Sequence, residues 1–303
     1  MTSFPPGYRI GHQTDLQRRT GCTVILPPPG TIAAVDVRGG APGTRETGVF
    51  APGNLVSEIH AVVFCGGSAF GLAAASGVAT WLRRRGAGFT VGSARVPIVA
   101  AAVLFDLAVG DPDAYPDEIM GAAACEAADE GDIPTGAAGA GSGATVGKLF
   151  GITRASPGGL GAARVTLPDG ESVAAIAAVN AFGDVVDPES GRLLAGPRGD
   201  GITSSARALT EDALAGVPLA GHTTLVCVAA TVPFEPGSLK RVAIEAHDGL
   251  ARAVRPAHSI LDGDVVFALA PGGPGPPPLL TRLRVGAAAA EAVARAIVNA
   301  VTS

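Results

Sequence analysis

Short runs in which almost every residue is apolar recur along the chain. They occupy residues 22–26, 32–38, 59–65, 163–167, 172–180, 223–231 and 265–270. Runs of this length without a polar face predict strands that are buried on both sides, because each face must lie against other apolar groups. The sequence therefore predicts sheets sandwiched between layers of helices, in one domain that spans residues 1–303.

Longer stretches predict helices at 68–85, 99–107, 119–129, 239–253 and 285–301. In 239–253, Leu239, Val242 and Leu250 recur at roughly helical spacing, and charged residues such as Lys240 and Glu245 fall between them. Strands and helices together predict a layered α+β or α/β architecture. The segment 202–220 is polar, small and rich in turn-forming residues, so we expect a long exposed connection there.

The composition adds a constraint on packing and on partners. Hydrophobic residues make up 47% of the chain but aromatic residues only 4%, and there are 43 glycines, so close approach of backbones is expected in place of aromatic packing. The formal net charge is −5, and the one basic cluster, residues 83–85, closes a predicted helix, where cations are favourable. Nucleic acid is therefore not an expected partner.

The cysteines and the first residues bear on cofactors and location. Cys22, Cys65, Cys125 and Cys227 are far apart and form no CxxC pair, which argues against a zinc site or a disulfide framework. No metal and no cofactor are expected. The start, "MTSFPPGYRIGHQTD", has no apolar segment of the kind found in secretory signals, so a cytoplasmic location is expected.

The stretch 59–82 contains no acid, lysine or arginine and is long enough to cross a membrane. The pair Gly66-Gly67 divides it, so we interpret it as a buried strand, a turn and a helix capped by Ser68. No membrane is expected as a partner. The same glycines resemble a dinucleotide fingerprint, but Ser68 stands where that motif needs its middle glycine.

A second glycine-rich stretch, "AGAGSGATVGK" (residues 138–148), resembles a phosphate-binding loop. That motif needs a glycine at position 142 and Ser or Thr after the lysine, whereas the sequence has Ser142 and Leu149. Nucleotide binding is therefore not predicted, and Lys148 is left without an explanation from this motif.

Four polar residues at the edges of predicted strands allow more than one interpretation each. Thr223 begins the strand in "AGHTTLVCVAATV" and is either a residue of high β-propensity or a nucleophile. Asp262 and Asp264 in "DGD" could orient an amine, bind a metal or form a turn, and Asn180 could donate to an oxyanion or form a turn. Taken alone, the turn interpretations are favoured.

Several sequence blocks, taken together and in their order along the chain, favour the active-site interpretations. "GGAPGTRET", "GGSAFGLAAASGVATWL", "GSGATVGKLFG", "VNAFGD", "HTTLVCVAATVPF" and "AHDGLARAVRPAHSILDGDVVFAL" resemble the corresponding blocks of the DmpA-like P1 peptidases, peptidase family S58. This family includes L-aminopeptidase/D-esterases, β-peptidyl aminopeptidases and nylon-oligomer hydrolases. The resemblance covers nearly the whole chain, so the sequence is identified as a member.

The resemblance implies an α+β fold of four layers, αββα, like that of the N-terminal nucleophile hydrolases. It also implies self-cleavage between His222 and Thr223 into fragments 1–222 and 223–303, with Thr223 as the nucleophile and its freed α-amine as the base. Lys148 would then lend positive charge and Asn180 would donate to the oxyanion. The processed chains are expected to form a homo-oligomer, a tetramer or larger.

The resemblance places Asp262 and Asp264 at family active-site positions as well, where they would position the threonine amine or the amine of a substrate. The expected substrates are small peptides, amino-acid amides or ω-amino-acid oligomers.

Two positions depart from the family pattern. His222 precedes the cut where the nylon-hydrolase branch has Asn, and Phe105 stands where active members carry a tyrosine whose hydroxyl supports the oxyanion. The first change predicts slower or absent processing, and the second predicts catalysis that is either weakened or tuned to an unusual substrate. The alternative is an uncleaved, catalytically silent relative that acts as a binding or scaffold protein.

Overall fold

Two five-stranded sheets form the centre of the protein. The structure is a computed structural model that describes residues 4–199, 204–211, 214, 216 and 221–302. The first sheet has the order β1 (Arg9–Asp15), β2 (Thr20–Leu26), β5 (Ala61–Cys65), β8 (Val99–Val103) and β4 (Thr44–Arg45). The second sheet has the order β11 (Gly159–Thr166), β12 (Ser172–Asn180), β15 (Thr223–Ala230), β17 (Val265–Pro271) and β3 (Thr31–Val37).

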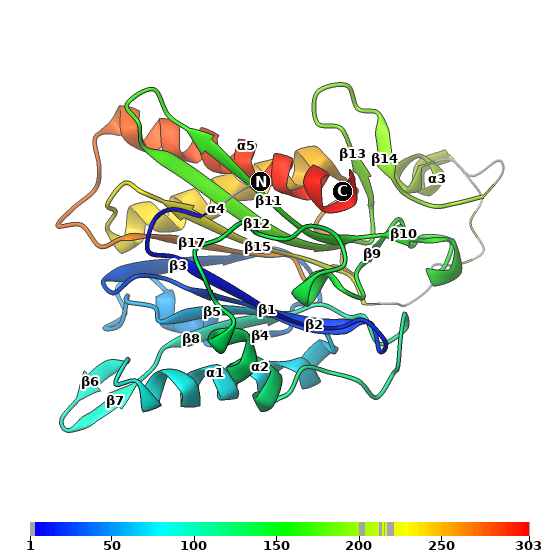
Figure 1. Cartoon of the computed structure of the whole chain (residues 1–303). Coiled ribbons are helices and arrows are strands. Elements are labelled where there is room, and N and C mark those ends of the chain that lie inside the picture. The colour runs from blue at the N-terminus through cyan, green and yellow to red at the C-terminus, as the bar shows by residue number, and fades with distance from the viewer. Residues whose placement is uncertain (1–3, 200–203, 212–213, 215, 217–220, 303) are drawn as a thin grey trace.

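Helices cover the outer face of each sheet (Figure 1). Helices α1 (Ala73–Arg84) and α2 (Glu118–Glu126) pack on the first sheet, and α4 (Pro236–Ala253) and α5 (Leu279–Thr302) pack on the second. The inner faces of the two sheets lie against each other, with Phe64 and Phe267 at a centroid distance of 6.2 Å. The order of layers is therefore αββα, which confirms the expected fold.

Shorter elements lie at the ends and edges of these layers. They are η1 (Thr47–Phe50), η2 (Ser68–Leu72), β6 (Phe89–Val91), β7 (Ala94–Val96), η3 (Gly139–Gly141), β9 (Thr145–Val146), η4 (Ile152–Arg154), β10 (Ser156–Pro157), β13 (Asp184–Val186), β14 (Leu193–Ala195), α3 (Ser205–Glu211) and β16 (Val254–Arg255). Helix α3 lies in the segment expected to be a long connection, of which residues 202–203, 212–213, 215 and 217–220 are outside the described residues. The connection therefore contains a helical turn that its polar composition did not predict.

Small residues bring the backbones of α1 and α2 together. A Cβ on Gly77 would lie 1.9 Å from the carbonyl oxygen of Glu118, and a Cβ on Gly121 would lie 2.1 Å from that of Ala74. No larger residue fits at either position without moving the helices apart. The close backbone contacts expected from the composition are thus present.

The stretch 59–82 is a strand, a turn and a helix, as predicted. It contains β5, the turn at Gly66-Gly67, the 3₁₀ turn η2 and most of α1. The predicted cap is wrong, because the Ser68 side chain makes no capping hydrogen bond and Ser68 lies within η2, with a φ of 53°. By length and composition alone, α5 could cross a membrane, and 56% of its most apolar window is buried inside the protein.

The prediction of a helix at 99–107 is wrong. Residues Val99–Val103 form β8, which pairs in parallel with β5 inside the first sheet, and an irregular segment follows. Alanine-rich sequence is compatible with a helix, but burial on both faces of a central strand also needs only small apolar residues, and the tertiary pairing decides between them.

Candidate active site

The second sheet brings the predicted site residues to one end of its central strands. Thr223 is the first residue of β15, and its cross-strand partner is Asn180, the last residue of β12. On the other side of β15, the segment before β17 places Asp262 next to His222 in a parallel bridge. Three segments that are distant in sequence therefore meet around the His222–Thr223 peptide bond.

Lys148 is buried at this end of the sheet. Its Nζ donates to Asn180 Oδ1 at 2.7 Å, to Asn180 O at 3.0 Å and to the carbonyl oxygen of Gly221 at 3.3 Å. Burial lowers the pKa of Lys148 to about 7, while the negative charges of Asp262 and Asp106 oppose that shift. A cationic or neutral amine is thus available next to the residues that precede Thr223.

The Asn180 side chain is fixed by three hydrogen bonds. Its amide oxygen accepts from Lys148 and from the backbone N–H of Thr145 at 3.0 Å, and its Nδ2 donates to the carbonyl oxygen of Phe105 at 3.0 Å. An amide nitrogen carries two hydrogens, and one of these is committed to Phe105. The orientation of the amide is therefore set by the protein before any substrate arrives.

Asp262 and Asp264 each accept three hydrogen bonds. Asp262 accepts from Phe182 N at 3.2 Å, from Ser259 N at 2.9 Å and from Ser259 Oγ at 2.5 Å. Asp264 accepts from Thr224 N at 2.7 Å and from the N and Nδ1 of His258 at 3.1 and 2.8 Å. Burial and the charge of Asp264 raise the pKa of Asp262. Both carboxylates connect strand ends to the turn at 258–259.

The carbonyl group of His222 lies against the candidate nucleophile. The Oγ1 of Thr223 donates to His222 O at 2.5 Å, and the backbone N–H of Gly263 donates to the same oxygen at 2.8 Å. A Cβ on Gly263 would lie 2.7 Å from Thr223 Oγ1, so only glycine leaves room for this hydroxyl. The peptide bond is therefore held between a hydroxyl and a backbone donor.

The two departures from the family pattern lie on either side of Gly221. The His222 ring is buried and packs edge-on against Phe182 at 5.0 Å. Burial and the nearby Lys148 lower the pKa of His222 to about 3, so the ring is neutral at pH 7. A Cβ on Gly221 would lie 2.3 Å from the Cβ of Phe105, so Phe105 packs tightly against this glycine. The phenyl ring of Phe105 offers no hydrogen-bond donor to the site.

A cavity of about 300 Å³ opens at the candidate nucleophile. It is lined by residues 41–43, 68–69, 103–105, 221–223 and Leu261, so both sheets contribute to its wall. This volume lies at the lower end of the range for ligand pockets, about 300–1,000 Å³. Thr223 thus lines a cavity that is large enough for a small molecule.

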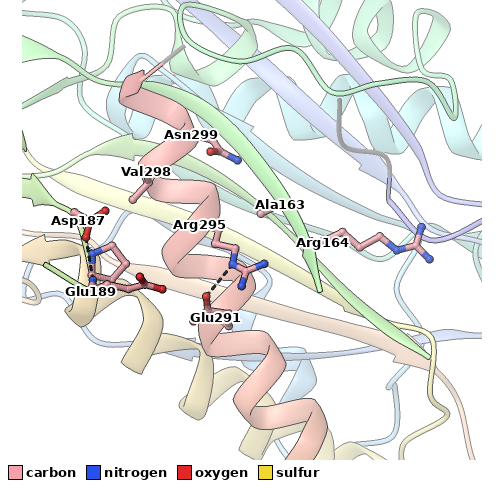
Figure 2. Close-up of a pocket in the computed structure, with 9 residues that line it drawn as sticks. Ala163, Arg164, Asp187, Glu189, Glu291, Arg295, Val298 and Asn299 are labelled. Carbon is pink, nitrogen blue, oxygen red and sulfur yellow. Dashed lines mark hydrogen bonds and ion pairs between the residues drawn. The ribbon is translucent and has the colours of Figure 1, made fainter. Parts of the chain in front are cut away.

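A second hollow, of about 440 Å³, lies on the outer surface between α5, β11 and the connection after β13. Figure 2 shows Arg295 joined to Glu291 on the same helix, with Asp187 and Glu189 at the opposite side, while Arg164 extends away from the pair. Arg295 Nε donates to Glu291 at 2.8 Å, so the charges here compensate one another. None of the predicted site residues lines this hollow.

The model of peptidase family S58 matches residues 6–303. An uncharacterised aminopeptidase of Mycobacterium bovis is 42% identical, over 97% of this chain and 91% of that protein. A 6-aminohexanoate-oligomer endohydrolase of a Kocuria species is 33% identical, over 87% of this chain and 73% of that protein.

The chain belongs to peptidase family S58. It is therefore a hydrolase that acts on peptide or amide bonds. The solved L-aminopeptidase D-Ala-esterase/amidase of Ochrobactrum anthropi, a variant of the N-terminal nucleophile hydrolase fold, superposes with a TM-score of 0.75 at 19% identity, over 99% of this chain and 86% of that one. A β-aminopeptidase of a Burkholderia species gives a TM-score of 0.70 at 21% identity, over 99% and 88% of the two chains.

Within the described residues, no group of three or more His, Cys, Asp and Glu side chains is arranged to hold a metal ion. The four cysteines are buried as free thiols.

Sequence reasoning missed four groups of the site: Asp106, His258, Ser259 and the N–H of Gly263. Asp106 was assigned to the wrongly predicted helix, which concealed its place at a strand end close to Lys148. The spacing of Ser259 and Asp262 is typical of a turn in which the side chains bond locally, and it could have been detected. His258 and Gly263 carry no local signal for the contacts that they make.

Proposed function

We propose that the chain is an N-terminal-threonine amidohydrolase that releases its own nucleophile by cleaving the His222–Thr223 bond. The observation that carries this proposal is the geometry of that bond, with Thr223 Oγ1 2.5 Å from the His222 carbonyl oxygen and the N–H of Gly263 donating to the same oxygen. A backbone donor at a carbonyl oxygen stabilises the negative charge that forms there during attack.

Self-cleavage proceeds in two steps. Thr223 Oγ1 loses its proton and attacks the carbonyl carbon of His222, the C–N bond breaks, and the nitrogen takes up a proton to become the free α-amine of Thr223. The product is an ester between His222 and Thr223. Water then hydrolyses the ester, which gives a carboxylate on His222 and restores the hydroxyl of Thr223.

In turnover, the freed α-amine of Thr223 serves as the general base for its own hydroxyl. The reference pKa of an α-amine is about 7.7–8.0, so a neutral fraction is present near pH 7. The hydroxyl oxygen attacks the substrate carbonyl, the amine product leaves with a proton, and water hydrolyses the acyl-enzyme. Lys148 supplies positive charge and Asn180 offers an amide donor, while Asp262 and Asp264 hold the surrounding backbone.

The proposed substrates are small peptides, amino-acid amides or ω-amino-acid oligomers. The cavity of about 300 Å³ supports small acyl groups. Relatives named aminopeptidase and 6-aminohexanoate-oligomer endohydrolase support both kinds of amide. We also propose a cytoplasmic homo-oligomer of processed chains, with no nucleic-acid or membrane partner.

Intact-mass measurement of the purified chain tests this proposal. We expect fragments 1–222 and 223–303 from the wild type, an intact chain from Thr223→Ala, and cleavage at a reduced rate from Thr223→Ser. Thr224→Val is the matched control, because its hydroxyl has no hydrogen-bond partner among the described residues. This variant should cleave like the wild type.

The contrary result is a wild-type chain that stays at 29.8 kDa and hydrolyses no aminoacyl-anilide. It would favour an uncleaved, silent protein with a binding or scaffold role. The variant Phe105→Tyr would then show whether the missing hydroxyl at position 105 causes the inactivity. It restores a hydroxyl donor at the cavity wall without changing Thr223. Activity gained in that variant would assign the defect to Phe105.

A further inference from the structure

His258 lies in the segment between β16 and β17 with an unusual backbone conformation. Its φ is 54°, in the left-handed region that residues other than glycine rarely occupy. Such a conformation persists only where surrounding contacts hold it, and it is found preferentially at functional sites. The contacts of His258 therefore need a specific explanation.

Two donors of His258 converge on one oxygen of Asp264. The backbone N–H lies 3.1 Å and the ring Nδ1 lies 2.8 Å from Asp264 Oδ2. A carboxylate oxygen only accepts, so Nδ1 carries a hydrogen.

A second histidine holds this ring from the side of helix α4. His247 is fully buried, and its ring meets the ring of His258 edge to face at 4.8 Å. His247 Nε2 lies 3.1 Å from the carbonyl oxygen of Asp36, so Nε2 carries the hydrogen of the ring. Burial lowers the pKa of His247 to about 4, so it is a neutral packing partner at pH 7.

The other oxygen of Asp264 reaches the strand that begins at the nucleophile. Oδ1 accepts from the backbone N–H of Thr224 at 2.7 Å. A carboxylate held at one oxygen only can rotate about its Cβ–Cγ bond, whereas two donors on Oδ2 fix its plane. His258 thereby determines where Asp264 holds Thr224, and hence the position of Thr223.

We propose that His258 is a positioning residue for amide hydrolysis, which acts through Asp264 and the backbone of Thr224 to place the hydroxyl of Thr223. This inference rests on the proposed function of Thr223. His258 itself touches neither the substrate cavity lining nor Thr223 through any hydrogen bond between the described residues. Its effect is therefore expected in the rate of the chemical step and not in substrate affinity.

Three substitutions in the full-length chain test this inference. His258→Asn keeps a nitrogen donor close to the position of Nδ1 and tolerates the left-handed backbone. His258→Gly removes the donor but adopts the same φ without strain. His258→Asp resembles Asn in shape but sets a carboxylate against Asp264.

We expect kcat for an aminoacyl-anilide to stay within about threefold of the wild type in His258→Asn, since a donor remains. It should fall at least about tenfold in His258→Gly and further in His258→Asp, with KM changed less than about twofold in the Gly variant. The thermal midpoint of His258→Gly should not fall in proportion to its loss of kcat, because glycine adopts the left-handed φ of position 258 without strain.

Wild-type kcat in His258→Gly would overturn the inference, as would a loss in His258→Asn equal to that in His258→Gly. These results differ from a failure of the proposed function, in which the wild type itself neither cleaves nor hydrolyses the substrate. A Gly variant that loses kcat only to the extent that it loses folded protein, measured by circular dichroism, would also overturn it.

Discussion

The two sheets have the same pattern of strand directions but different chemistry at their ends. In the orders given above, successive pairs are antiparallel, antiparallel, parallel and antiparallel in both sheets. The parallel pair is β5–β8 in the first sheet and β15–β17 in the second. The backbone framework alone therefore does not decide which sheet carries the reactive group.

The difference lies in how polar groups at the ends of these parallel pairs are bonded. At β15–β17, Asp264 accepts three hydrogen bonds. At β5–β8, Asp106 accepts from the N–H of Gly67 at 2.7 Å through Oδ1, and the side-chain hydroxyl of Thr20 lies beside its carboxyl group. Burial raises the pKa of Asp106. The second sheet provides a fixed polar site, and the first sheet provides the opposing wall of the cavity.

Removal of the buried amine should have the largest effect. Lys148→Met removes one hydrogen-bond donor from each of three acceptor oxygens and removes positive charge from the site. We expect kcat/KM for an aminoacyl-anilide to fall by about 100-fold or more. Arg295→Met, at the hollow on α5, is the control and should stay within about twofold, since its ion pair is exposed. Equal losses in both variants would contradict the assignment of the site.

Asp264 in the second sheet and Asp106 in the first should respond unequally to replacement by asparagine. Asp264→Asn places an NH₂ group against donors of His258 or Thr224, and we expect kcat to fall by about 10- to 100-fold. Asp106→Asn can keep its bond to the N–H of Gly67, and the Thr20 hydroxyl beside it can accept from the new NH₂ group. We expect less than a threefold change by steady-state kinetics. Similar losses would show that the two strand ends are equally important.

Lys148, which is buried at the end of the second sheet, should make the unfolding free energy depend on pH. The folded-state pKa of Lys148 is about 7, below its ordinary value of 10.5, so the unfolded chain binds more protons between these pH values. The unfolding free energy should therefore rise with pH from about 7 to 10, by at most about 1.4 kcal/mol per pH unit from this group. Urea unfolding at several pH values checks this, and Lys148→Met should lack that part of the slope.

The smallest expected effect concerns the turn after β5. Ser68 has a φ of 53°, similar to that of His258, so Ser68→Gly should relieve strain and raise the unfolding free energy by about 0.5 kcal/mol. Gly67→Ala is the contrasting variant, because a Cβ there would lie 2.3 Å from Tyr115 Cβ and φ is 76°, and it should be destabilising. Thermal unfolding of the two variants measures this contrast. Shifts of the thermal midpoint in the same direction in both variants would contradict the prediction.

Local pattern in the sequence predicted much of the layered fold. The runs at β2, β5, β12, β15 and β17 were found because a strand covered on both faces leaves a continuous apolar signature. The run at β8 was misread as a helix, since short alanine-rich segments suit either state. The ordered family blocks, and not the periodicity, singled out Thr223, Lys148, Asn180, Asp262 and Asp264.

The sequence by itself determined the strands of the second sheet, β2 and β5 of the first sheet, the S58 family and the residues that meet at the His222–Thr223 bond. Only the tertiary structure decided that Asp262 and Asp264 are bonded to backbone N–H groups, that His258 holds Asp264, and that the first sheet forms the wall facing Thr223. These are contacts between strand ends and turns from distant parts of the chain. Periodicity records which face of an element is buried, but it contains no information about the partner that buries it.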